Sequence, residues 1–364
     1  MYHPKDRHIN ILIASSWTGG HVFPGICISE ELKKNIHKAN IIFVTSKKDP
    51  APKILRRYKY KTIFLNVEGI KGKTLIKRIN TILKLPVFLI QSLRIIKKNQ
   101  PCIVVGLGGS ICGPICIASK IMGIPFVIHE QNLFPGFTNR FLYPFADKVF
   151  ISFKNTNHIL RGKHVIFSGN PVRQEFFSIE KEKNNIFTVL IVGGSQGSHA
   201  INNASLEALQ ILKKGGKRLN IIHQTGVRDF QEVKHRYKNF DLNVKIIPFI
   251  EDMVSAIKKA DIVISRAGAS SIFELSASKT PAILIPYPHS ADQHQQKNAL
   301  FLAKLGAIEL IPQNELTGLR LANSIKRYMD NPEKLERMRH KFSLIAKPNS
   351  ANIISDHIME ILKI

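Results

Sequence analysis

His21 directly follows a glycine pair in the segment Ser16-Trp17-Thr18-Gly19-Gly20-His21. The segment lies between an apolar run, Ile9 to Ala14, and a helical pattern that continues to about Leu32. A strand, a glycine loop and a helix start bring unpaired backbone N–H groups and the positive end of a helix dipole close to a ligand, which is typical of phosphate sites. His21 adds a titratable group at the same place. The segment therefore predicts a site that binds an anion and transfers a proton; a histidine with a structural role alone is the alternative.

A second loop of this kind, Gly193 to Ser198, follows the apolar run Thr188–Val192. Its glycines and the helix start after it suit a phosphate or a diphosphate. It is not the dinucleotide fingerprint, because the G-x-G-x-x-G pattern fits from neither glycine and no acidic residue ends a strand about 20 residues further on. We predict that Ser195 donates its hydroxyl to a phosphate, with a helix-capping serine as the alternative.

A third loop runs from Ser265 to Glu274 and supplies small residues at a helix start. Glu274 follows Gly268 by six residues, and a carboxylate in that position can accept both hydroxyls of a ribose. A surface glutamate favoured by the helix dipole is the alternative. Downstream, the polar run Asp292 to Asn298 offers amide groups that suit sugar hydroxyls, unless it is simply an exposed polar helix.

The run His129-Glu130-Gln131-Asn132 closes a predicted strand, and Gly108-Gly109 precedes a predicted helix. Both would lie at the same edge of a parallel sheet as His21. A metal site formed by His21, His129 and Glu130 is a weaker interpretation, because the spacing of these residues does not support tetrahedral ligation. We predict neither a metal nor a cofactor.

The elements that position these residues alternate along the chain. Apolar runs alternate with amphipathic helical patterns, which predicts an α/β fold with largely parallel sheets. The chain ends in a helical pattern at about Asn352 to Leu362. Strands are expected at Ile9–Ala14, Ile41–Thr45, Thr62–Asn66, Cys102–Gly106, Phe126–His129, Lys148–Ile151, Thr188–Val192, Asn220–Gln224, Val244–Pro248, Ile262–Ser265 and Ala282–Pro286.

The two halves of the chain resemble each other. Residues 11–21 correspond to residues 189–199, and residues 103–128 correspond to residues 262–285. Two Rossmann-like units in tandem would put the glycine loops at the carboxyl ends of the strands, facing a shared cleft. A turn and a charged segment over residues 169–185 mark the expected boundary.

The length and charge of the chain are consistent with two domains and an anionic partner. The chain has 364 residues, enough for two cores. It carries 53 Lys and Arg against 26 Asp and Glu, a formal charge of +27. This excess favours nucleic acid, an anionic membrane or a phosphorylated substrate, and a general compositional bias toward Lys, Asn and Ile is an equally good explanation.

The basic charge is concentrated between Ala51 and Lys98. This stretch has 13 Lys and Arg residues and Glu68 as its one acid, with many aliphatic residues between them. Apolar side chains flanked by cations predict contact with an anionic bilayer surface, although part of them must belong to an ordinary core. Nucleic acid is the alternative, but no recognition module is visible.

The cysteines and the uncharged stretch Pro101 to Ser119 carry no separate function in this interpretation. The four cysteines lie in apolar runs and are expected to be small buried thiols of a reducing compartment. The polar start of the chain lacks the apolar core of a secretory signal. Glycines and prolines within Pro101 to Ser119 favour a strand, a turn and a packed helix over a membrane span.

Taken in order, these segments resemble the MurG family, the bacterial N-acetylglucosaminyltransferases of glycosyltransferase family 28. The match covers almost the whole chain, and the series of motifs is far more specific than any one of them. The matching segments are Thr18–Gly25, Gly69–Lys73, Gly106–Gly109, His129–Asn132, Gly169–Arg173, Gly193–Gly197 and Arg266–Glu274.

The resemblance implies the GT-B fold, in which two Rossmann-like, doubly wound parallel-sheet domains face a central cleft. It implies an N-terminal acceptor- and membrane-binding domain over residues 1–170, with a last helix at about 345–364 packed back on it. Residues 171–344 would form the domain that binds UDP-GlcNAc.

The resemblance also implies an activity. GlcNAc would pass with inversion from UDP-GlcNAc to the 4-hydroxyl of MurNAc in undecaprenyl-diphosphate-MurNAc-pentapeptide (lipid I), giving lipid II for peptidoglycan synthesis. His21 would be the catalytic base, kept neutral by the helix N-terminus. Helix N-termini after Ser195 and Gly268 would stabilise the departing UDP. The enzyme would be peripheral on the cytoplasmic face of the bacterial plasma membrane, with other cell-wall synthesis proteins as further partners.

The substrate contacts that the family pattern implies fall on three groups of residues. Arg173 and Ile250 would lie near the uridine, Glu274 at the ribose, and Asn132 and Gln295 on the sugar side. The full set is Thr18, Gly19, Gly20, Asn132, Arg173, Ser195, Ile250, Ala269, Ser270, Ser271, Ile272, Phe273, Glu274 and Gln295.

The chain departs from the family pattern at three places. Ser16-Trp17 stands where the family usually has two glycines, Ser110 where it has an aromatic residue, and Ala267 where many members have serine. Three other functions stay open at this point: a related GT-B enzyme acting on diacylglycerol, an NAD-dependent oxidoreductase and a basic nucleic-acid-binding protein.

Overall fold

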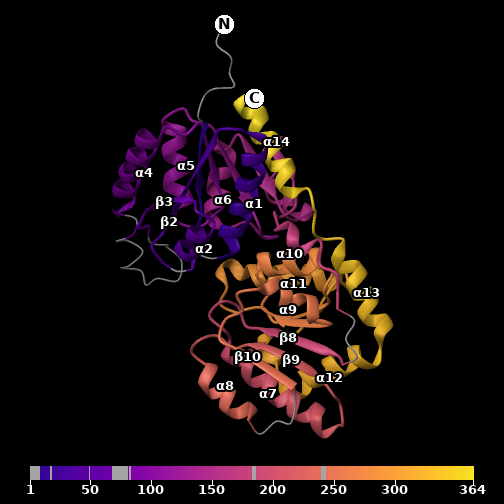
Figure 1. The fold of residues 1–364 in the computed structure, drawn as a ribbon. Helices are drawn as coiled ribbons and strands as arrows, with labels where there is room; N and C mark the ends of the chain where they lie inside the picture. Colours follow the sequence, from indigo (N-terminus) through magenta and orange to yellow (C-terminus); the bar gives the residue numbers. More distant parts are fainter. Residues whose placement is uncertain are drawn as a thin grey trace. The chain divides into compact units, whose positions relative to one another are not determined.

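The computed structural model describes residues 9–16, 19–48, 50–67, 81, 83–182, 186–238 and 243–364 (Figure 1). The predicted substrate contact Thr18 and the segment Gly69–Lys73 lie outside the described residues. The chain divides into two compact units. Unit 1 consists of residues 1–172 and 347–364, and unit 2 of residues 173–346.

Within its described residues, unit 1 forms a seven-stranded parallel sheet in the order β3-β2-β1-β4-β5-β6-β7. The order reverses at β1, which is the doubly wound pattern. The strands are β1 (Ile9–Ala14), β2 (Ala39–Thr45), β3 (Lys61–Phe64), β4 (Ile103–Gly106), β5 (Phe126–Glu130), β6 (Lys148–Ile151) and β7 (Val165–Phe167).

Helices cover both faces of this sheet, as the continuous apolar runs of its central strands require. Alternate residues of β1 serve the two cores: Ile11 and Ile13 belong to one cluster, and Leu12 and Ala14 to the other. The helices are α1 (Gly19–Asn35), α2 (Ala51–Arg57), α4 (Leu85–Asn99), α5 (Cys112–Ile121), α6 (Phe137–Leu142) and α14 (Ser350–Leu362), with single turns η2 (Tyr143–Phe145) and η3 (Lys154–His158).

The last helix, α14, returns to unit 1 and packs on α1 (Figure 1). Ile354 and Ile358 are fully buried in the same core as Ile11. The Asn352 amide donates to Glu31 at 2.6 Å, so polar contacts fix the direction of the helix as well.

Within its described residues, unit 2 repeats the same plan with a six-stranded parallel sheet in the order β10-β9-β8-β11-β12-β13. The strands are β8 (Thr188–Val192), β9 (Asn220–Gln224), β10 (Asn243–Ile247), β11 (Ile262–Ser265), β12 (Ala282–Leu284) and β13 (Glu309–Leu310). The helices are α7 (His199–Lys214), α8 (Phe230–Tyr237), α9 (Met253–Lys259), α10 (Ala269–Ala277), α11 (His294–Lys304), α12 (Gly318–Asp330) and α13 (Pro332–Ser343), with single turns η4 (Gln174–Phe176), η5 (Ala291–Gln293) and η6 (Gln313–Glu315). The predicted pair of Rossmann-like parallel sheets is therefore confirmed.

Two edge strands, β7 and β13, were not predicted. They have three and two residues, too few for an apolar run to identify them. Pro101 to Ser119 forms β4, a turn and the start of α5, as predicted. No helix in the described part of the chain is both long and apolar enough to span a bilayer.

The prediction of uniformly buried cysteines was wrong for Cys102. Cys112 and Cys116 are buried on the core side of α5, whereas Cys102 is exposed and Cys27 is half-buried. Cys102 precedes β4 at the amino-terminal edge of the sheet, where an apolar neighbourhood in the sequence does not guarantee burial.

Candidate functional site

His21 lies in the first turn of α1, at the carboxyl end of β1. Its Nδ1 is hydrogen-bonded to the backbone carbonyl of Leu107, which follows β4. A carbonyl oxygen can only accept a hydrogen bond, so Nδ1 carries the proton. Nε2 therefore keeps its lone pair, and His21 is held in the tautomer of a general base.

The glycine pair after β4 lets its loop approach the loop after β1. A Cβ on Gly109 would lie 2.5 Å from Cβ of Ser16, and Gly109 has a φ of +84°. A Cβ on Gly108 would lie 3.2 Å from Cε1 of His21, at a φ of +89°. Side chains at these two positions would push the loops apart, and their positive φ values disfavour any residue with a Cβ. Glycine is therefore required at both positions, for space and for backbone conformation.

Glu130 organises the residues after β5. Its carboxylate accepts hydrogen bonds from the backbone N–H of Asn132 at 2.9 Å, the N–H of Gly136 at 2.9 Å and the amide of Asn139 at 2.8 Å. Burial raises the pKa of Glu130, and these hydrogen bonds oppose the rise. The carboxylate thereby fixes Asn132, one of the predicted substrate contacts.

His129 and Glu130 both have protein partners. Burial lowers the pKa of His129 to about 4, so its imidazole is neutral. Its Nε2 lies 3.2 Å from the carbonyl oxygen of Gly169. Over the described residues, no group of three His, Cys, Asp or Glu side chains is arranged to hold a metal ion.

In unit 2, the loop after β8 leads into α7. Ser198 caps this helix, since its Oγ accepts from the N–H of Ile201 at 3.4 Å. The alternative interpretation, in which Ser195 caps the helix, was therefore wrong, because the cap lies three residues further along the chain. Ser195 is exposed in the turn before the cap, and its contact with a phosphate stays a prediction.

Two further glycines bring the loop after β8 against the loop after β9. A Cβ on Gly197 would lie 2.0 Å from the carbonyl oxygen of Thr225, and a Cβ on Gly226 would lie 2.3 Å from the carbonyl oxygen of Gln196. The two backbones are thus in direct contact, which fixes the shape of the predicted phosphate loop.

Gln224, at the end of β9, connects two of the predicted substrate-binding segments. Its amide donates to the carbonyl of Gly194 at 2.9 Å, and its Oε1 accepts from the N–H of Ile250 at 2.8 Å. Gln224 was not predicted as a site residue. The available signal was the polar run His223 to Thr225 at the carboxyl end of an otherwise apolar strand.

Arg266 was also missed, although it follows β11 directly. Its guanidinium donates to Ser198 Oγ at 2.6 Å and to the carbonyls of Ile285 and Pro286 at 3.1 and 3.3 Å. Burial lowers the pKa of Arg266 to about 10, so it stays charged near neutral pH. It places a positive charge beside the N-terminus of α7.

The loop after β11 begins α10, with Gly268 in an extended conformation before the first turn. Ser270 and Ser271 are half-buried, and Ala269 is at the edge of burial. Ile272 and Phe273 have fully buried side chains. Any ligand contact of these last two residues must therefore be made by the backbone.

Glu274 lies one turn further along α10 and faces Arg173, with Oε1 and Nη2 3.6 Å apart. The structure thus brings two predicted substrate contacts together. The Glu274 side chain is 18% exposed, and burial raises its pKa to about 7 while Arg173 opposes the rise. Arg173 is held over the ring of Phe176, 4.7 Å from its centroid.

Gln295, in the first turn of α11, accepts a hydrogen bond from the backbone N–H of Tyr287 at 3.0 Å. The two residues that enter this helix, Asp292 and Gln293, have φ values of +52° and +55°. Left-handed conformations at consecutive non-glycine residues store strain of about 1–3 kcal/mol each. Such strain concentrates at functional segments. It is therefore consistent with the predicted sugar contact of Gln295.

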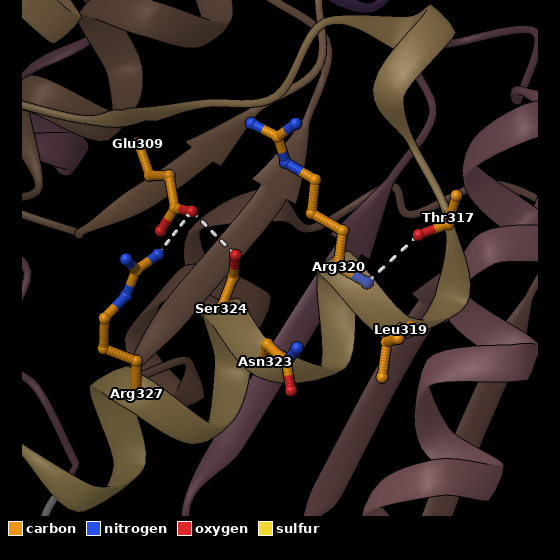
Figure 2. A pocket seen from close by; sticks show the side chains of 7 residues that line it. All are labelled: Glu309, Thr317, Leu319, Arg320, Asn323, Ser324 and Arg327. Carbon is orange, nitrogen blue, oxygen red and sulfur yellow. Dashed lines mark hydrogen bonds and ion pairs between the residues drawn. The ribbon is translucent and has the colours of Figure 1, made fainter.

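A hollow of about 550 Å³ lies beside α12, away from the predicted residues (Figure 2). Ser324 and Arg327 both donate to the Glu309 carboxylate there, at 2.7 and 2.6 Å. Its lining contains no predicted site residue and consists of Glu309, Thr317, Leu319, Arg320, Asn323, Ser324 and Arg327.

Comparison with known proteins identifies the family. The Glycosyltransferase family 28 N-terminal domain matches residues 11–151, and the Glycosyltransferase family 28 C-terminal domain matches residues 188–356. The UDP-N-acetylglucosamine–N-acetylmuramyl-(pentapeptide) pyrophosphoryl-undecaprenol N-acetylglucosamine transferase of Syntrophus aciditrophicus is 39% identical, over 98% of this chain and 99% of its own length. The chain belongs to the MurG family of glycosyltransferase family 28. The enzyme of the same name from Myxococcus xanthus is 36% identical, over 97% of this chain and 93% of its own.

Solved structures agree with the MurG family assignment. The crystal structure of Acinetobacter baumannii MurG has a TM-score of 0.78 and 28% identity, and the match covers 97% of this chain and 99% of that one. A Staphylococcus aureus MnaA–UDP complex has a TM-score of 0.72 at 13% identity, which shows a shared fold alone. The family resemblance inferred from the motifs is therefore confirmed.

Proposed function

We propose that this protein transfers GlcNAc, with inversion, from UDP-GlcNAc to the MurNAc 4-hydroxyl of undecaprenyl-diphosphate-MurNAc-pentapeptide, giving lipid II for peptidoglycan synthesis. Membership of the MurG family supports the substrates. The observation that carries the chemistry is the hydrogen bond from His21 Nδ1 to the Leu107 carbonyl, because it leaves Nε2 as a proton acceptor. In one displacement, the acceptor oxygen bonds to C1 of GlcNAc, the bond from C1 to UDP breaks, and the hydroxyl proton goes to Nε2.

Unit 2 is proposed to hold the nucleotide. Arg173 and Ile250 would contact the uridine, Glu274 the ribose, and Ser195 with the N-terminus of α7 the diphosphate. The leaving UDP gains negative charge as its bond to the sugar breaks. The helix N-termini and the fixed guanidinium of Arg266 offer preorganised stabilisation of that charge without a cofactor.

Each unit is proposed to carry further substrate contacts of its own. On unit 1, Gly19, Gly20 and Asn132 would contact the donor, with Asn132 on its sugar side. On unit 2, Gln295 would contact the sugar side of the donor. Ala269, Ser270 and Ser271 would contribute the backbone N–H groups of the first turn of α10. Ile272, whose N–H donates to the Gly268 carbonyl, and Phe273 would contact the donor through other backbone atoms. We propose unit 1 as the acceptor- and membrane-binding domain.

Ribose binding predicts a pH dependence of donor affinity. With a pKa of about 7, Glu274 is mostly ionised at pH 8 and mostly protonated at pH 6. Two ribose hydroxyls can donate to the ionised form but not equally to the protonated one, so affinity falls as the pH falls. We expect UDP-GlcNAc to bind about tenfold more weakly at pH 6 than at pH 8, measured by titration calorimetry.

UDP-GlcNAc suits this measurement because both of its phosphates are esterified and do not titrate in this range. Glu274→Gln is the matched control: it should bind more weakly than the wild type, with an affinity that is flat between pH 6 and 8. Equal pH slopes in the two proteins would assign the effect to groups other than Glu274.

We further propose that the protein binds the cytoplasmic face of the plasma membrane through an apolar patch before and along the first half of α4. We define this patch as Leu83, Leu85, Val87 and Ile90. Leu83, Val87 and Ile90 are 70%, 51% and 50% exposed. Exposed cations lie on the same segment, namely Lys84 beside the patch and Arg94, Lys97 and Lys98 further along α4. Exposed apolar side chains with cations before and after them on one helix suit the surface of an anionic bilayer.

Placing two carboxylates in this patch should weaken membrane binding. We expect Val87→Glu with Ile90→Glu to lower the affinity for phosphatidylcholine vesicles with 30% phosphatidylglycerol by about tenfold or more, because apolar area is lost and repulsion is added. Sedimentation of the vesicles measures the bound fraction. The control pair Val227→Glu with Leu319→Glu, also exposed but in unit 2, should bind like the wild type; equal losses in both pairs would rule out the patch.

The deciding experiment for the activity uses purified protein with a choice of substrates. UDP-GlcNAc or UDP-GalNAc is offered as donor, and a lipid I analogue or diacylglycerol as acceptor. We expect GlcNAc transfer to the lipid I analogue to exceed every other combination. Preferred transfer to diacylglycerol would instead support a related lipid glycosyltransferase.

A further inference from the structure

The Leu107 carbonyl, which sets the tautomer of His21, accepts a second hydrogen bond. Gln131 Nε2 donates to the same oxygen at 3.0 Å. The peptide that carries this carbonyl is followed by Gly108 and Gly109, both at positive φ. Glycine places little restriction on rotation of the preceding peptide plane. The direction of the carbonyl therefore depends on the groups that donate to it.

Gln131 is itself oriented by His129. Its Nε2 lies 3.2 Å from His129 Nδ1, and the Nε2 of His129 faces the Gly169 carbonyl. The Gly169 carbonyl can only accept a hydrogen bond, so the proton of His129 is on its Nε2. His129 Nδ1 is therefore an acceptor. The lowered pKa of His129, about 4, keeps this neutral arrangement through the physiological range.

The Leu107 carbonyl and His129 Nδ1 account for both hydrogens of the Gln131 amide group, and the His129 carbonyl oxygen lies 3.4 Å from the same nitrogen as a third, longer contact. One points to the Leu107 carbonyl and the other to His129 Nδ1. Turning the amide over would place its oxygen against two acceptors, which is repulsive. Gln131 is 2% exposed, so water does not readily replace either contact. The amide thus has one favourable orientation.

We propose that Gln131 is a positioning residue for His21. Acting through the Leu107 carbonyl, it holds the His21 ring in the tautomer that leaves Nε2 unprotonated. This inference rests on the proposed role of His21 as the base. It assigns a function to the third residue of the His129–Asn132 motif, which the nucleotide and sugar contacts do not use.

The test replaces Gln131 with methionine, which keeps the approximate volume and removes both donors. The ¹⁵N spectrum of histidine-labelled protein reports the tautomer, with His21 assigned by comparison with His21→Gln. We expect the wild type to show protonated Nδ1 on His21, and Gln131→Met to show a mixture of both tautomers. The kcat with a soluble lipid I analogue should fall about 10–100-fold, because the catalytic group is misplaced, while the KM for UDP-GlcNAc changes less than about twofold.

Asn99→Leu is the matched control. Asn99 is also a buried amide of unit 1, and it donates to the Ile95 carbonyl at 2.8 Å at the end of α4. Its replacement should leave the His21 tautomer and kcat unchanged. Thermal melting of Gln131→Met and Asn99→Leu shows whether any loss of kcat reflects unfolding. Gln131→Glu serves as a second variant that lacks the two amide donors.

A double-mutant comparison separates positioning from general structural damage. If Gln131 acts through His21 alone, Gln131→Met should not lower the residual rate of His21→Ala any further. A further loss there, or an unchanged tautomer in Gln131→Met, would overturn the proposal. Near-normal turnover by His21→Ala would instead remove the base assignment, and the NMR measurement would still decide whether Gln131 orients the ring.

Discussion

Replacing His21 with alanine should lower the rate of GlcNAc transfer about 10²–10⁴-fold and leave the affinity for UDP-GlcNAc nearly unchanged. The reason is the tautomer: Nδ1 donates to the Leu107 carbonyl, so Nε2 carries the lone pair that accepts the hydroxyl proton. Without the imidazole of His21, the acceptor hydroxyl attacks with its proton still attached. Nucleotide recognition is proposed to use residues of unit 2, which the substitution does not touch.

Single-turnover kinetics with saturating UDP-GlcNAc measure the chemical step directly, and calorimetry measures donor binding. His21→Gln is a useful companion, because its amide can still donate to the Leu107 carbonyl but offers no comparable base. The rate of His21→Gln should be nearly as low as that of His21→Ala. Turnover within about threefold of the wild type in either variant would remove His21 from the base role.

Gly197→Ala should destabilise unit 2 by about 3–5 kcal/mol and greatly weaken UDP-GlcNAc binding. The added Cβ would lie 2.0 Å from the carbonyl oxygen of Thr225, at a φ of +76°. The opposing atom belongs to the backbone, so no side-chain rotation can relieve the overlap. The loop must move away from Thr225 and Gly226, and the N-terminus of α7 moves with it.

Gly216→Ala separates the two causes of this loss. Gly216 is in the same unit with a similar φ of +72°, but a Cβ there would meet nothing within 4 Å. It should cost about 1–2 kcal/mol, the price of the left-handed backbone alone, and leave donor binding intact. Thermal unfolding with and without UDP-GlcNAc measures both quantities. Equal losses in the two variants would show that the contact with Thr225 does not matter.

Much of the fold was accessible from the sequence because its signals are local. The apolar runs of β1, β4, β8 and β11 are continuous, as strands buried on both faces must be. Glycine pairs directly after strands marked the loops at the carboxyl edges of the sheets. β7 and β13 were not accessible, because two or three residues at a sheet edge carry no periodic signal.

The candidate site also has a part that could be predicted from the sequence and a part that could not. The residue types of His21, Asn132, Glu274 and Gln295 and the family motifs around them were visible in the chain, so their roles could be predicted. Their partners could not. The contact from His21 to Leu107 joins residues 86 positions apart, and that from Arg266 to Ser198 joins residues 68 apart.

By itself, the sequence determined the Rossmann-like repeat, the family and the residues available for chemistry, because backbone flexibility, apolar periodicity and motif order are written along the chain. Only the tertiary structure decided which nitrogen of His21 carries the proton, that Ser198 and not Ser195 caps α7, and that Gln131, Gln224 and Arg266 hold the loops. Those outcomes depend on hydrogen-bond partners that meet only when parallel strands bring distant loops to one edge of a sheet.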